Sequence, residues 1–245
     1  MRLLSFATGN LYRYIADFNL VEFIDKLGTD GIEYTYGKSY GERIITKSDE
    51  NILLKKKDIS MHVPFGFMKN PINLEKDTQD FKKILLDYKR IGAKRLVLHP
   101  NQILSKELLL IGKKQGVEYI TENLSKRTVE DKYKNNRRFS FETILNEHKD
   151  FGLCLDVSHS YSWSKNETKF IVDKWNDRIK QVHFSITHYN KGHLGVNSAS
   201  KSFLDSVKCL HELDVPIVIE EDMLSINPIE IKKEINRVKK IVGLN

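Results

Sequence analysis

The sequence has few cysteines and no long hydrophobic run. Its 245 residues include only two cysteines, Cys154 and Cys209, which lie far apart. A disulfide framework is therefore not expected, and a reducing cytoplasm is the natural location. No apolar run approaches the roughly 18 residues of a membrane span, and the first residues lack the hydrophobic region of a signal peptide. We expect a cytoplasmic protein that makes no contact with a membrane.

The sequence also has no linker and no low-complexity stretch. A chain of 245 residues that is 40% hydrophobic fits one large α/β domain, which we expect to span residues 1–245. Strand-like segments are expected near 2–7, 31–37, 59–64, 95–100, 117–123, 152–156, 179–185 and 216–221. Helix-like periodicity follows most of them, near 11–27, 48–57, 73–91, 105–116, 141–148, 168–175, 203–213 and 228–242. Eight strand–helix units predict a parallel sheet closed into a (β/α)8 barrel, with an open doubly wound sheet as the alternative.

The chain carries an excess of positive charge. Its formal net charge is +7 and its pI is about 9.1. This favours an anionic partner, either a nucleic acid or a phosphorylated small molecule, although solvated lysine-rich helices give the same total. A basic stretch follows the fifth strand, and its Lys126, Arg127, Arg137 and Arg138 could follow a nucleic-acid backbone. The alternative is an ordinary solvated loop.

The sixth strand ends in a carboxylate and is followed by a histidine. The segment 152–159 is apolar up to Asp156, and His159 comes three positions later. Such an apolar run is typical of a strand buried on both faces. A buried carboxylate needs a partner, and a metal ion would engage both side chains. By itself the segment is equally compatible with a hydrogen-bonded Asp156 and a surface His159.

The same pattern returns along the chain. Six strands present a possible metal ligand at their carboxyl ends: His62, His99, Glu122, Asp156, His183 and Glu220. His159 and His193 are expected just beyond, in loops on the same face, which carries the active site in barrels of this kind. Unrelated structural residues would be scattered over both ends of the barrel, so the clustering predicts a metal site.

The predicted ligands are imidazoles and carboxylates, without a thiolate. This set suits Zn²⁺ most, and also Mn²⁺, Co²⁺ or Fe²⁺. Glu122 lies between the two histidine-bearing strands and Asp156 in the chain, so its carboxylate could bridge two ions.

Seven stretches of the sequence resemble the xylose isomerase-like barrel superfamily, and within it the endonuclease IV type of apurinic/apyrimidinic endonuclease, or AP endonuclease family 2. They are residues 61–64, 97–100, 121–123, 153–159, 182–183, 191–195 and 216–220. The resemblance implies a metal quartet of Glu122, Asp156, His183 and Glu220. It also implies a second site of His62 and His99 with Glu122 shared, and a third with His159 and His193.

The sequence departs from the endonuclease type at one position. Where that family has an aspartate two residues before the loop histidine, this chain has Lys191. A cation there cannot ligate and would repel a third ion, so we expect one or two ions rather than three.

Two reactions remain open. As a hydrolase of phosphodiesters, such as abasic-site DNA, the protein would use a metal-activated hydroxide, with Lys191 holding a phosphate oxygen. As an isomerase or epimerase of a sugar or sugar phosphate, it would use one ion, with Glu122 and Glu220 exchanging a proton. A non-catalytic relative that only binds a ligand is a third possibility, against which the complete quartet argues. The two histidines His62 and His99 and the basic charge favour the hydrolase.

Overall fold

A computed structural model of the protein describes residues 2–14, 19–35, 45–63, 74–102, 106–132, 140–188 and 191–244. Eight parallel strands close into a barrel in the order β1-β10-β7-β6-β5-β4-β3-β2. They are β1 Leu4–Ala7, β2 Gly31–Thr35, β3 Asp58–His62, β4 Arg95–Leu98, β5 Tyr119–Glu122, β6 Gly152–Asp156, β7 Ile179–Phe184 and β10 Ile217–Ile219. The predicted (β/α)8 barrel is therefore confirmed, and the open sheet is excluded, because β1 pairs with both β2 and β10.

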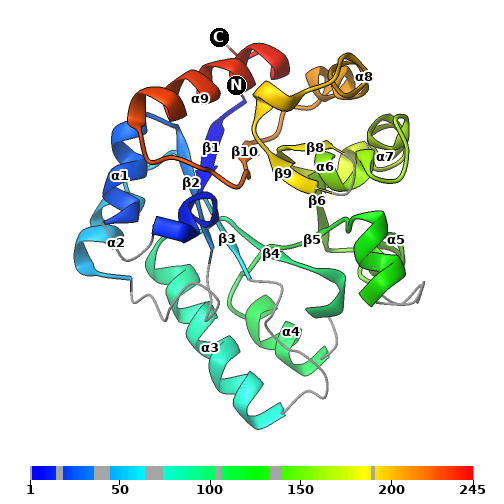
Figure 1. Cartoon of the computed structure of the whole chain (residues 1–245). Coiled ribbons are helices and arrows are strands. Elements are labelled where there is room, and N and C mark those ends of the chain that lie inside the picture. Colours follow the sequence, from blue (N-terminus) through cyan, green and yellow to red (C-terminus); the bar gives the residue numbers. More distant parts are fainter. Residues whose placement is uncertain are drawn as a thin grey trace.

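Helices surround the barrel (Figure 1). They are α1 Leu20–Leu27, α2 Lys47–Leu53, α3 Leu74–Arg90, α4 Lys106–Lys113, α5 Phe141–Glu147, α6 Val157–Tyr161, α7 Glu167–Trp175, α8 Lys201–Ser206 and α9 Pro228–Val242. Within the residues that the structure describes, no helix is long and apolar enough to cross a membrane.

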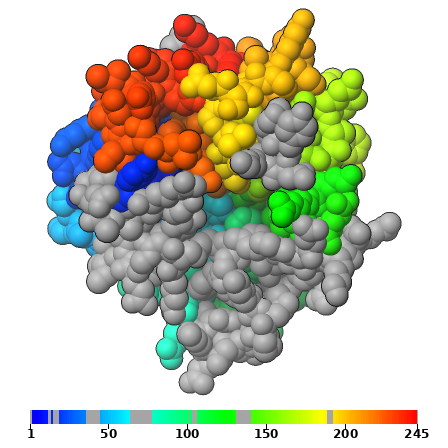
Figure 2. Space-filling model, viewed as in Figure 1, coloured from blue at the N-terminus to red at the C-terminus, as the bar shows by residue number. Residues whose placement is uncertain are grey.

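Several predicted helices are shorter than their periodicity suggested, including the one expected at 11–27, where α1 begins only at Leu20. The short helix α6 and a hairpin after β7 were not predicted. The helix expected at 48–57 ends as α2 at Leu53, and the one expected at 203–213 is α8 followed by a 3-10 turn at Lys208–Glu212. An antiparallel hairpin, β8 Ile186–His188 with β9 Lys191–Leu194, follows β7. In Figure 2 this hairpin, in yellow, lies next to the orange segment that leads into α9.

Alternation along the strands places apolar residues under the helices, while the inside of the barrel holds polar residues together with a small cluster of Val97, Ile120 and Cys154. In β2 and β7, for example, Ile32 and Val182 belong to the main hydrophobic core. The alternate residues Glu33 and Gln181 hydrogen-bond to each other, although β1 and β10 separate their strands in the sheet. Their contact therefore crosses the inside of the barrel. Because successive strand residues point to opposite faces, the strands carry polar groups into the barrel while their other face packs under the helices.

Close helix–strand packing depends on a glycine in α4. A Cβ atom on Gly112 would lie 1.7 Å from the hydroxyl of Tyr119, which is buried at the start of β5. A larger residue at position 112 would therefore displace α4 from β5, the strand that ends in Glu122.

Candidate metal centre

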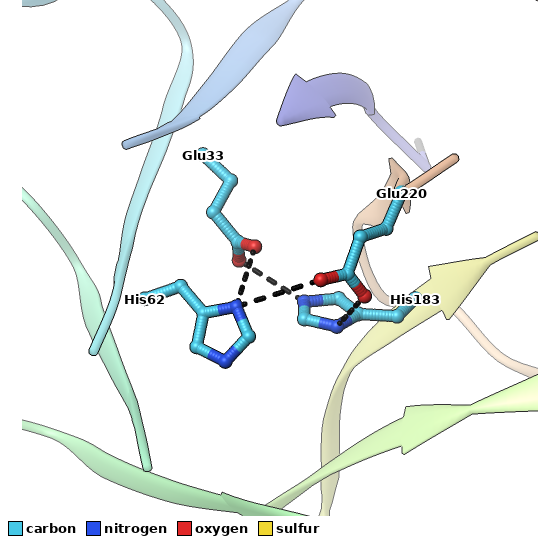
Figure 3. A group of neighbouring side chains, drawn as sticks. All are labelled: Glu33, His62, His183 and Glu220. Carbon is cyan, nitrogen blue, oxygen red and sulfur yellow. Dashed lines mark hydrogen bonds and ion pairs between the residues drawn. The ribbon is translucent and has the colours of Figure 1, made fainter. Parts of the chain in front are cut away.

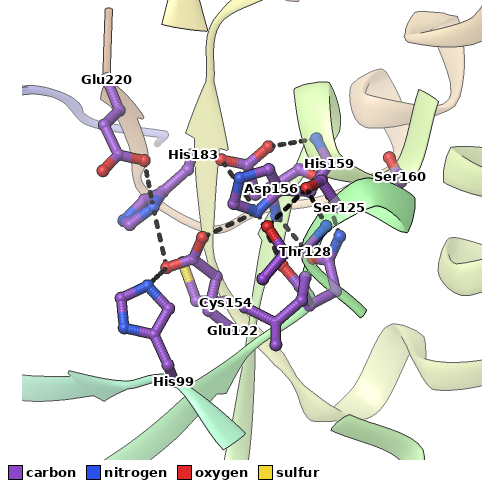
Figure 4. Close-up of polar contacts among 12 residues, drawn as sticks. His99, Glu122, Ser125, Thr128, Cys154, Asp156, His159, Ser160, His183 and Glu220 are labelled. Carbon is purple, nitrogen blue, oxygen red and sulfur yellow. Dashed lines mark hydrogen bonds and ion pairs between the residues drawn. The ribbon is translucent and has the colours of Figure 1, made fainter. Parts of the chain in front are cut away.

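Six of the side chains singled out in the sequence meet at the carboxyl end of the barrel. His62, Glu122 and Asp156 are the last residues of their strands, His183 is near the end of β7, and His99 and Glu220 directly follow β4 and β10. All except Glu220 are almost fully buried. The structure therefore places potential ligands from six strands in one polar cluster, part of which is drawn in Figure 4.

Neighbouring amide side chains fix the backbone at several of these strand ends. The Asn123 side chain accepts a hydrogen bond from the Asp156 backbone N–H (2.8 Å) and donates one to the Asp156 carbonyl (3.0 Å). Gln102 accepts from the His99 N–H (2.7 Å). Asn10 donates to the carbonyl of Ile219 (2.8 Å), the residue before Glu220. The backbone around the cluster is thus held by hydrogen bonds that do not use the ligating atoms.

The first group of potential ligands is Glu122, Asp156, His183 and Glu220. Each residue offers one ligand atom, and these four atoms lie within 4.8 Å of one another. His183 Nδ1 is 2.8 Å from Glu220 Oε2 and 3.7 Å from Glu122 Oε2. Glu122 Oε2 and Asp156 Oδ2 are buried and make no hydrogen bond, whereas His183 Nδ1 and Glu220 Oε2 contact only each other closely. Buried polar atoms are normally paired, and a cation among these four would satisfy them together.

The second group shares Glu122 with the first. His62 Nε2 lies 3.3 Å and His99 Nε2 lies 3.6 Å from Glu122 Oε2. The three residues offer ligand atoms within 4.8 Å of one another. One carboxylate oxygen therefore faces a histidine nitrogen from each of β3, β4 and β7, which is an arrangement suited to bridging two ions.

A third group contains His159 and His193 together with Asp156. The sequence predicted both histidines in loops, but the structure places them in regular elements. His159 lies in the short helix α6, because the Asp156 carboxylate accepts the His159 backbone N–H (2.6 Å) and caps that helix. His193 lies in β9 with a φ of 56°. The residue two positions earlier, Lys191, is also in β9, and its side chain lies outside the described atoms.

The buried carboxylates and imidazoles of the cluster shift each other's pKa values. Burial disfavours charge on His62, but its contacts with Glu122 and Glu33 outweigh burial and raise its pKa to about 10. Asp156 and Glu122 do the same for His159, whose pKa also rises to about 10. His99 is dominated by burial, which lowers its pKa to about 4. Without metal, positive rings therefore balance the buried carboxylates, and ion binding must displace protons.

These shifts predict a pH dependence for the metal-free protein. The folded-state pKa values of His62 and His159 lie above the ordinary value of 6.5. Their contribution to stability is therefore complete below pH 6.5 and is lost as the pH rises through 10. We expect urea denaturation of chelator-treated protein to give a free energy of unfolding that falls between pH 6.5 and 9.5, and falls less in His62→Gln. A constant or rising value would contradict these charge pairs.

Glu33 belongs to the cluster although it was not singled out in the sequence. It lies within β2, is fully buried, and forms a further group with His62, His183 and Glu220 (Figure 3). Its pKa is low, because the nearby His183 and His62 outweigh the opposing effect of burial. Cys154, by contrast, belongs to none of these groups of described residues, and burial raises its pKa to about 12, so that its thiol stays protonated.

A cavity of about 890 Å³ opens beside the third group of ligands. His159 and His193 line it together with Lys126 and Arg127, which follow β5. Lys126 is 3.8 Å from Glu130, so its charge is only loosely paired. The predicted basic residues Arg137 and Arg138 lie outside the described residues. The cavity thus joins positive charge to the metal-binding end of the barrel.

Comparison with known proteins identifies the fold. No protein-family model and no curated protein sequence matches the chain. Among solved structures, an L-ribulose 3-epimerase is similar, with a TM-score of 0.68 and 10% identity over 99% of this chain and 95% of that chain. A xylose isomerase domain protein from Planctomyces limnophilus has a TM-score of 0.59 and 11% identity, over 98% and 97%. An AP endonuclease of family 2 from Brucella melitensis has a TM-score of 0.54 and 13% identity, over 94% and 96%.

Proposed function

From the xylose isomerase-like (β/α)8 fold that the chain shares with these structures, we propose that it is a metal-dependent hydrolase of phosphodiesters in nucleic acid. The observation that carries the proposal is the second ligand group. A sugar isomerase of the kind considered from the sequence needs only the quartet. Here His62 and His99, at 3.3 and 3.6 Å from Glu122 Oε2, would add a second site that shares Glu122 with the first.

The residues have distinct roles in this proposal. Glu122, Asp156, His183 and Glu220 would hold one ion, and His62 and His99 with the shared Glu122 would hold the other. Two ions, for which this donor set suits Zn²⁺ most, would when bound supply an activated water and offset charge on the phosphate. Burial of the carboxylates keeps bulk water from screening these charges. His159 and His193, at the edge of the cavity, would face the substrate.

Positive side chains beside the cavity would bind the phosphate backbone. Lys126 and Arg127 line the cavity that His159 and His193 also line. The net charge of +7 would also attract a polyanion such as nucleic acid from a longer distance. Lys191 precedes His193 by two residues, and we propose that it holds a phosphate oxygen in place of a third ion. Arg137 and Arg138 would extend this basic surface.

The alternative is a sugar or sugar-phosphate isomerase or epimerase with one ion. Glu122 and Glu220 both approach His183 Nδ1, at 3.7 and 2.8 Å, so either carboxylate could face a substrate bound to an ion there. Proton exchange between these two carboxylates would then carry the reaction. The likeness to L-ribulose 3-epimerase over nearly the whole chain makes this the second candidate.

The test is cleavage of a duplex that contains one abasic site. We expect nicking with Zn²⁺ or Mn²⁺ supplied, no nicking after chelation, and weaker binding as salt rises. Lys126→Ala and Arg127→Ala should each weaken binding and reduce the salt dependence by about one counterion, because each removes one phosphate contact. Lys114→Ala, at an exposed lysine directly after α4, is the matched control. No nicking with metal bound, together with epimerisation of a keto-sugar, would favour the alternative.

A further inference from the structure

We propose that Glu33 is a positioning residue that orients one histidine of each ion site, His183 and His62. Its two carboxylate oxygens face different rings. Glu33 Oε2 lies 3.1 Å from His183 Nε2, and Glu33 Oε1 lies 3.4 Å from His62 Nδ1. The inference rests on the metal centre described above and is independent of which substrate the protein uses.

The opposite nitrogen of each ring faces the proposed ions. His183 Nδ1 is 2.8 Å from Glu220 Oε2, and His62 Nε2 is 3.3 Å from Glu122 Oε2. A carboxylate can only accept a hydrogen bond when ionised, so Glu33 favours a proton on His183 Nε2 and on His62 Nδ1. When an ion displaces the second proton, the remaining nitrogen of each ring can ligate on the side of Glu220 for His183 and of Glu122 for His62.

Hydrogen-bond donors surround Glu33 Oε2, which argues that this oxygen orients His183 and does not bind an ion. Ser60 Oγ donates to this oxygen (2.8 Å), and so does Gln181 Nε2 (2.6 Å). With His183 Nε2 also at 3.1 Å, its lone pairs are occupied. A cation placed at Oε2 would meet hydrogens of the serine and the amide. The other oxygen, Oε1, makes no hydrogen bond, and it faces His62 Nδ1 at 3.4 Å.

Gln181 shows why a carboxylate is needed at this position. Arg95 Nε donates to Gln181 Oε1 (3.0 Å), and because a guanidinium only donates, the amide oxygen faces Arg95 and the NH2 group faces inward. That NH2 nitrogen lies 2.9 Å from His183 Nε2. An amide donor alone would favour an unprotonated Nε2 and put the proton on Nδ1, where the ion has to bind. The charge of Glu33 reverses this preference.

The orientation of Gln181 is itself fixed from the amino end of the barrel. Arg95 Nη2 contacts both oxygens of Asp58 at 2.6 Å, and Ser5 Oγ donates to Asp58 (3.3 Å). Asp58, Arg95, Gln181 and Glu33 are all buried. They form a continuous polar column through the barrel interior that ends at His183, so the side chains behind the ligands have little freedom to rotate.

The unaltered protein provides the first test. In zinc-loaded protein, ¹⁵N spectra of the imidazoles should show a proton on Nε2 and metal on Nδ1 of His183. His62 should show the reverse, with a proton on Nδ1 and metal on Nε2. Metal on Nε2 of His183, or an Nε2 without a proton, would overturn the assignment of Glu33. This measurement does not depend on whether a variant folds.

The second test is Glu33→Gln, which keeps the size of the side chain and removes its charge. We expect zinc affinity, measured by competition with a chelator, to fall about 10- to 100-fold. Ser60→Ala, which removes one donor and keeps the carboxylate, should leave both affinity and ring protonation nearly unchanged. Gln181→Met should retain the proton on His183 Nε2, because Glu33 still accepts it.

The possible outcomes separate this inference from the metal centre itself. If the unaltered protein binds no zinc, the metal centre is wrong. If it binds zinc and Glu33→Gln binds it equally well with the same ring protonation, the metal centre stands and the role of Glu33 is wrong.

Discussion

Replacement of Glu122 with Gln should abolish the activity of the protein, whichever substrate it uses. Glu122 Oε2 faces His62, His99 and His183, so it is the one carboxylate common to the two ligand groups at the centre of the cluster. A glutamine is neutral and presents an NH2 group that repels a cation. Loss of the electrostatic stabilisation that two ions provide corresponds to about 4 kcal/mol or more, or about a thousandfold in rate.

The measurement is the rate of nicking together with the metal content of the purified variant. Glu118→Gln is the matched control, because Glu118 directly precedes β5 and is exposed at the other end of the same strand. It should keep full metal content and full activity. If Glu122→Gln retains two ions or a rate within tenfold of the unaltered protein, Glu122 does not bridge two ions.

Removal of metal should also lower the thermal stability of the fold. Glu33, Glu122, Asp156 and Glu220 are carboxylates that lie within one cluster, and bound ions would replace the protons that otherwise balance them. A ligand at about 100 times its Kd stabilises the folded state by about 2.7 kcal/mol. For a chain of this length that corresponds to a shift in Tm of roughly 5–10 °C.

The comparison of Tm before and after chelation measures this effect, with readdition of Zn²⁺ to reverse it. Glu122→Gln serves as the control, since a chelator should hardly change the Tm of a variant that has already lost its ions. If the Tm stays the same although the metal content has fallen to zero, bound ions do not stabilise the fold and this prediction is wrong.

The barrel and the ends of its strands could be predicted because they leave a direct mark in the sequence. Apolar runs that end in His62, Glu122 and Asp156 are buried strands, and in a closed parallel sheet their carboxyl ends face the same way. Hence residues up to about 160 positions apart in the chain could be grouped from the sequence before their distances were known.

Glu33 was missed because it does not stand at the end of its strand. The prediction considered strand ends, whereas Glu33 lies in the middle of β2 between Ile32 and Tyr34. A charged residue flanked by core residues in a fully buried strand was the available signal, since alternation sends it into the barrel. Its contacts with Gln181 and His183, on a strand about 150 positions later, follow only from closure of the sheet.

The prediction that His159 and His193 lie in loops was wrong, because short-range contacts determine the structure around them. Asp156 caps α6 with its own carboxylate, so the chain turns into a helix where a loop was expected. The hairpin of β8 and β9 places His193 in a strand, where the glycine, asparagine and serine residues of this segment indicated a loop. The part of Asp156 in the third ligand group depends on these backbone turns and could not be predicted from spacing.

The most direct test of the account is to locate zinc in crystals of the zinc-loaded protein by anomalous diffraction. We predict two peaks per chain on either side of the Glu122 carboxylate. One peak should be coordinated by His62 and His99, and the other by Asp156, His183 and Glu220. A single ion held by the quartet would contradict the two-ion centre, and an absence of zinc from these residues would contradict the metal centre as a whole.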